Sequence, residues 1–131
     1  TATWSGQNTA KVQFTHRTEG RGGVCGRLIY GGHVISLARA LYCNGLANAW
    51  HVAAINGGRH VAPLGAGETV YAWSEVIETA EMPGRDDAGA LRLRTVATKD
   101  RPCADFPYVD ADNRYDPAVI LDIDYWALVP R

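Results

Sequence analysis

Hydrophobic and polar residues alternate with a period of two in four stretches that follow residue 50. Such alternation is typical of strands that bury one face. The first stretch covers residues 51–56 and is ended by Gly57-Gly58, and the second covers residues 69–79. The third and fourth cover residues 90–98 and 118–129. The pattern therefore predicts four strands.

A different pattern precedes the strands. Between Val34 and Tyr42 only Ser36 and Arg39 are polar, and Asn44-Gly45 is typical of a helix end. A helix that is apolar nearly all round is buried on most of its sides. We therefore expect a helix that begins at Gly32 and is enclosed by the rest of the domain.

One apolar helix followed by four antiparallel strands predicts an α+β fold in which the sheet curls around the helix, the hotdog fold. We expect residues 1–131 to form a single domain of this kind. One unit alone would leave a sheet edge and one side of the helix uncovered. We therefore expect a homodimer, or pairing with a second hotdog half within a longer, double-hotdog protein.

Composition excludes several classes of partner. The net charge of −1 comes without any cluster of Lys and Arg, which argues against nucleic acid. No apolar run reaches the ~18 residues of a membrane span. The three cysteines are widely spaced, which favours a reduced, cytoplasmic setting and no structural metal. The aspartates in residues 99–117 lack the spacing of a calcium loop, so we expect a solvated flap there.

Several longer sequence segments resemble those of a known family. GRLIYGGHVISLARAL (26–41) resembles the segment that opens the central helix in MaoC-like and R-specific enoyl-CoA hydratases. NTAKVQF (8–14) and YDPAVILDIDY (115–125) are similar to the C-terminal half of mesaconyl-CoA hydratases, also called β-methylmalyl-CoA dehydratases. The resemblance implies reversible addition of water to an enoyl-CoA such as mesaconyl-CoA. The CoA thioester would be the substrate, and no cofactor is implied.

The same motif implies an oxyanion site at the start of the helix. It places Gly32 at the family's oxyanion-binding glycine, with Gly31 immediately before it and in contact with substrate. A helix N-terminus offers unpaired N–H groups, and glycine lets a ligand approach the backbone closely. Negative charge on a thioester oxygen would be stabilised there.

The acid–base residues are less clear-cut. The family's catalytic Asp and His fall at Asn8 and Gln13, and neither of these side chains titrates near neutral pH. Three alternatives stay open: Asn8 and Gln13 orient a water, His16 acts as the base, or this copy is a non-catalytic half. His33, on the first turn of the helix, is a further candidate.

A basic pair follows the double glycine. Arg59 and His60 are candidates for binding the extra carboxylate of a mesaconyl-type substrate, or the CoA phosphates. Two other functions remain as alternatives, a hotdog acyl-CoA thioesterase and a non-catalytic acyl-CoA-binding subunit. The thioesterase would need a carboxylate near the helix, and no Asp or Glu occurs between Gly32 and Trp50.

Overall fold

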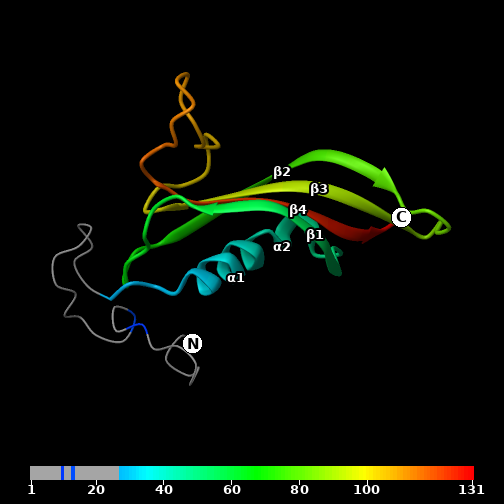
Figure 1. Cartoon of the computed structure of the whole chain (residues 1–131), viewed down its shortest axis with the longest axis horizontal. Coiled ribbons are helices and arrows are strands. Elements are labelled where there is room, and N and C mark those ends of the chain that lie inside the picture. Colours follow the sequence, from blue (N-terminus) through cyan, green and yellow to red (C-terminus); the bar gives the residue numbers. More distant parts are fainter. Residues whose placement is uncertain (1–9, 11–12, 14–26) are drawn as a thin grey trace.

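The computed structural model describes residues 10, 13 and 27–131. Two helices, α1 (Gly31–Leu41) and α2 (Cys43–Leu46), precede the strands. The strands are β1 (His51–His60), β2 (Val70–Glu81), β3 (Ala88–Lys99) and β4 (Val119–Pro130). Figure 1 shows α1 lying along one face of the sheet, while the chain between β3 and β4 rises from the other face. The predicted α+β order of a helix followed by four strands is confirmed.

The strands form one antiparallel sheet in the order β1-β4-β3-β2. The central pair, β3 and β4, supplies most of the core, because alternate residues of both strands face α1. Leu93 lies opposite Tyr125, and Ala97 lies opposite Leu121; all four are buried. The alternation seen in the sequence thus becomes one apolar face that α1 covers.

The helix is less enclosed than expected. Val34 and Ala38, one turn apart, are buried, whereas Leu41 is 42% exposed and Ala40 is also exposed. The prediction of a helix buried on most sides is therefore wrong for this chain by itself. The physical reason is that one sheet face contacts only one stripe of a helix, so the remaining apolar side faces outward.

Strand β1 is longer than the glycines suggested. The prediction ended it before Gly57-Gly58, but both glycines pair with β4, opposite Asp124 and Ile123. Glycine weakens a strand without ending it, and a register shift between Ile55 and Gly57 absorbs the irregularity. The last two residues of β1 therefore lie on opposite faces of the sheet.

Residues 100–118 pack on the sheet face that lies away from α1. Trp73 donates from Nε1 to the carbonyl of Pro107 at 3.3 Å, and its ring meets Tyr108 edge to face. The predicted flap is thus a packed segment rather than only a solvated one. Among the described residues no cluster of His, Cys, Asp and Glu could hold a metal ion. Within the same ranges, no helix has the length and apolar character to span a membrane.

Candidate functional site

Two segments that are far apart in the sequence meet beside the start of α1. The N–H of Ile29 donates to the carbonyl of Leu64 at 2.9 Å, and the N–H of Ala66 donates to the carbonyl of Arg27 at 2.9 Å. The chain entering α1 is therefore held against the chain that leaves β1. This pairing places the first turn of α1 next to the end of β1.

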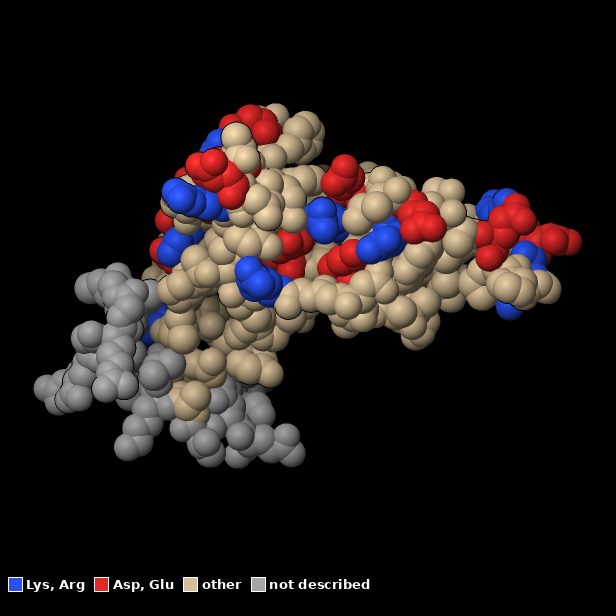
Figure 2. Space-filling view, turned by 45° about the horizontal axis from the view of Figure 1, so that its top comes forward, with Lys and Arg blue, Asp and Glu red and all other residues tan. Residues whose placement is uncertain are grey.

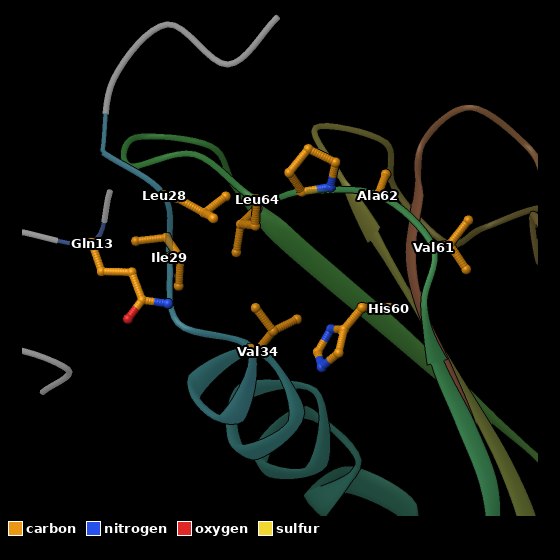
Figure 3. Close-up of a pocket in the computed structure, with 10 residues that line it drawn as sticks. Gln13, Leu28, Ile29, Val34, His60, Val61, Ala62 and Leu64 are labelled. Atoms are coloured by element: carbon orange, nitrogen blue, oxygen red, sulfur yellow. The ribbon is translucent and has the colours of Figure 1, made fainter. Parts of the chain in front are cut away.

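A cavity of about 270 Å³ occupies the angle between these segments. Figure 3 shows His60 beside the first turn of α1, near Val34, with Gln13 approaching from the N-terminal part of the chain. Ligand pockets usually measure roughly 300–1,000 Å³, so this cavity suits a short acyl group rather than an entire coenzyme. Most of its lining is apolar. The lining residues are Gln13, Leu28, Ile29, Gly31, Val34, His60, Val61, Ala62, Pro63 and Leu64.

The backbone at the start of α1 leaves donors available. The carbonyl of Tyr30 accepts the N–H groups of His33 at 2.9 Å and Val34 at 3.3 Å. No side chain caps the helix, and no described residue accepts the N–H groups of Gly31 and Gly32. Because the helix dipole adds partial positive charge at this end, the two amides are suited to bind a negatively charged oxygen.

The cavity reaches the two glycines unequally. Gly31 lines it, and a Cβ at Gly31 would stand 2.9 Å from Nε2 of His60. Gly32 does not line it, and a Cβ there would stand 2.5 Å from Cε1 of Tyr30. The ring of Tyr30 therefore lies against Gly32, and the oxyanion role of Gly32 stays a prediction.

The remaining predicted residues divide into three groups. Asn8 and His16 lie outside the described residues. Gln13 lines the cavity, which brings it together with Gly31 and His60. His33 is exposed and is absent from the lining, so a role for it as donor or base also stays a prediction.

Arg59 lies on the other face of the sheet. It pairs with Asp122 in the register of β1 and β4, whereas His60 pairs with Leu121, which belongs to the core facing α1. The binding role predicted for Arg59 stays untested, and its neighbours are those of the outer face.

Paired charges cover that outer face, and Figure 2 shows basic and acidic side chains intermixed over it. Asp122 accepts hydrogen bonds from Tyr108 at 3.1 Å and Tyr115 at 2.8 Å. Burial and the hydrogen bond to Asp122 raise the pKa of Tyr115 to about 12. Arg92 donates two hydrogen bonds to Asp124, at 3.1 and 2.8 Å, and this fork lowers the pKa of the Asp124 carboxyl. The outer face is thus held by internal pairing.

Sequence reasoning missed much of the cavity wall. Residues 61–64 and the Leu28-Ile29 pair carry no chemical motif, and they come together only through the contact between the two segments. One signal was available: alternation continued past Gly58 would have placed His60 on the face that packs on α1.

Comparison with known proteins supports the resemblance seen in the sequence. No family model matches the chain. The chain is 62% identical over 125 residues to beta-methylmalyl-CoA dehydratase of Chloroflexus aurantiacus, covering 95% of this chain and 36% of that protein. It is 57% identical over 129 residues to mesaconyl-CoA hydratase of Cereibacter sphaeroides, covering 95% of this chain and 35% of that protein. The chain therefore spans about a third of the length of the curated relatives it matches.

Solved structures show the same fold. The crystal structure of a MaoC domain protein dehydratase from Chloroflexus aurantiacus matches with a TM-score of 0.87 and 62% identity, over 95% of this chain and 36% of that one. A monoamine oxidase regulatory protein from Archaeoglobus matches with a TM-score of 0.60 at 16% identity, over 85% of this chain and 65% of that one, which shows the fold alone. The chain therefore has the hotdog fold of MaoC domains and is homologous, over nearly its whole length, to about a third of the matched dehydratase and hydratase.

Proposed function

We propose that this chain takes part in the reversible addition of water to an enoyl-CoA, with mesaconyl-CoA as the candidate substrate. The observation that carries the proposal is the 62% identity to beta-methylmalyl-CoA dehydratase over 95% of the chain. The cavity supports it independently, because the amide of Gly31, which has no acceptor among the described residues, lies at a helix N-terminus beside a small, mostly apolar space. Such donors stabilise the oxyanion that forms when a nucleophile adds to a conjugated thioester.

In this proposal the acyl group enters the cavity while the coenzyme remains outside. Gly31 and Gly32 offer N–H groups to the thioester oxygen. Gln13, together with Asn8 and the segment to His16, orients the attacking water. A thioester already acidifies its α-carbon, so the reaction needs no cofactor.

Pairing with a second hotdog unit belongs to the same proposal. The chain covers only 36% of its relative, which leaves room for another domain in a longer protein. Apolar side chains also remain uncovered on and beside the edge strand β1, where Ile55 is 65% exposed and Trp50 is 58% exposed. The partner unit would come from another copy of the chain or from a second half. The cytoplasmic location likewise stays a prediction.

The test is a spectrophotometric assay of the 131-residue chain with mesaconyl-CoA, following the absorbance of the conjugated thioester. Crotonyl-CoA, which lacks the free carboxylate and the methyl branch of mesaconyl-CoA, serves as the comparison substrate. A thiol reagent in a parallel reaction detects free CoA.

Consumption of the double bond without release of CoA supports the proposal. Release of CoA would instead indicate the thioesterase alternative. Binding of mesaconyl-CoA without turnover, at enzyme concentrations near that of the substrate, would contradict catalysis and favour the non-catalytic acyl-CoA-binding subunit.

A further inference from the structure

Among the described residues that line the cavity beside α1, one carries an imidazole. Of the described residues that line it, Gln13 contributes an amide and His60 an imidazole, and all the others are apolar or glycine. An amide side chain cannot act as a general acid or base near pH 7, whereas an imidazole can. Any proton that these lining residues give or take must therefore pass through His60.

The position of His60 is set by both neighbouring elements. As the last residue of β1 it pairs with Leu121 of β4, so its side chain points to the face that packs on α1. There its Nε2 lies 2.9 Å from the position that a Cβ of Gly31 would occupy. The imidazole is thus placed directly beside Gly31, the residue whose amide is proposed to bind the thioester oxygen.

The imidazole of His60 also has no polar partner within the described part of the chain. None of the described residues shares a hydrogen bond or ion pair with it. His60 is exposed, so nothing in these ranges seals it from the cavity. The imidazole is therefore accessible to a water molecule or to substrate.

We infer that His60 is the catalytic residue that transfers the proton in the hydration reaction, an inference that rests on the proposed function. Neutral His60 accepts a proton from water as the water oxygen bonds to the β-carbon. The electron pair of the double bond moves to the α-carbon and the thioester oxygen, which the amide of Gly31 stabilises. The imidazolium then returns its proton to the α-carbon, so that one water is added and neutral His60 is restored.

This assignment explains how the site works although Asn8 and Gln13 stand where the resembling hydratases have Asp and His. Gln13 can hold the water by hydrogen bonds without receiving its proton. His60 approaches the same cavity from β1, a different element from the one that precedes the helix.

The experiment compares the unaltered chain with His60→Gln, His60→Ala and the control His51→Gln, which changes an exposed residue at the other end of β1. Hydration of mesaconyl-CoA gives kcat and KM, and calorimetric titration with butyryl-CoA, which has no double bond to hydrate, gives the affinity for the acyl group. Loss of a general acid–base group typically costs about 10²–10⁴-fold in rate. We expect His60→Gln to lose about 10²-fold or more in kcat with unchanged affinity for butyryl-CoA, and His60→Ala to regain activity when imidazole is added.

Two results would overturn the inference while the proposed function stands. In one, His60→Gln keeps a kcat like that of His51→Gln. In the other, its affinity for butyryl-CoA falls as far as its kcat, which would assign His60 a binding role. Absence of turnover by the unaltered chain would instead overturn the proposed function itself.

Discussion

The imidazole of His60 lies against Gly31, so close that a single methyl group on the glycine would stand 2.9 Å from Nε2. This contact joins the last residue of β1 to the first residue of α1. A side chain at Gly31 would therefore displace the imidazole, because real Cβ atoms do not approach another atom so closely.

Replacing Gly31 with Ala should lower activity with little effect on stability. The new methyl group would push the imidazole of His60 aside and narrow the approach to the free amide, whereas alanine is a better helix former than glycine. We expect kcat/KM for mesaconyl-CoA to fall by about 10- to 10³-fold, the range for loss of an aligned oxyanion or proton-transfer group. Steady-state kinetics and a thermal melt measure the two effects.

Gly45→Ala is the matched control, because a Cβ at Gly45 meets nothing within 4 Å. It should leave kcat/KM unchanged. Equal losses in the two variants would show that Gly31 has no special place in the site.

The hydrogen bond from Tyr115 to Asp122 should stabilise the fold in a pH-dependent way. Folding raises the pKa of Tyr115 from 10 to about 12, so its contribution is complete below pH 10 and is lost as the pH rises from 10 to 12. Tyr115→Phe should cost about 1 kcal/mol in the free energy of unfolding at pH 8. The difference from the unaltered chain should shrink above pH 10, as measured by urea unfolding.

Tyr71→Phe, which removes the hydroxyl of an exposed tyrosine, is the control and should change stability little at either pH. A Tyr115→Phe variant as stable as Tyr71→Phe at pH 8 would be inconsistent with the role given to this hydrogen bond.

The pair of Arg92 and Asp124 should contribute stability that acid removes. Hydrogen bonds from Arg92 hold the pKa of Asp124 below its ordinary value of 3.8. The stabilisation is therefore present above about pH 4 and is lost as the pH falls through the lowered pKa. Asp124→Asn should lower the midpoint of urea unfolding at pH 7. The difference in midpoint between this variant and the unaltered chain should close as the pH falls below 4.

Glu78→Gln is a suitable comparison, since Glu78 meets the same Arg92 at 3.5 Å on a more exposed site. Glu78→Gln should lower the urea midpoint less than Asp124→Asn does. A larger loss in Glu78→Gln would reverse our assignment of the principal partner of Arg92.

Leu93 is buried in the centre of the sheet, opposite Tyr125. Leu93→Ala should destabilise the chain by about 3 kcal/mol, because it removes buried methyl groups and leaves a cavity. Leu41→Ala, on the uncovered side of α1, should change stability by no more than about 0.5 kcal/mol in a monomer. Urea unfolding measures both. A large cost for Leu41→Ala would show instead that this side of the helix is covered in solution.

The order of elements could be predicted because local patterns determine it. Alternation marked the strands, and the apolar run after Gly32 marked the helix. The end of β1 could not be predicted from the sequence. Gly57 and Gly58 weaken a strand locally, but pairing with β4 overrides this local effect and the strand continues. The opposite orientations of Arg59 and His60 follow from this continuation alone.

The candidate site was only partly predictable for a related reason. Gly31 and Gln13 stood out through their resemblance to a motif, and both line the cavity. The opposite wall depends on the pairing of Ile29 with Leu64, a contact between distant parts of the chain that no local pattern encodes. Enclosure of α1 was overestimated because the sequence shows that a side is apolar, but not which neighbour covers it.

The proposed function requires an acyl-CoA to reach the amide of Gly31 at the start of α1. Titration of the ¹⁵N-labelled chain with butyryl-CoA, followed by amide resonances in NMR spectra, tests this directly. We expect the resonance of Gly31 to shift together with that of His60, while those of Gly84 and Gly89, away from the cavity, stay in place. An unchanged Gly31 resonance at saturating butyryl-CoA would contradict the proposed function.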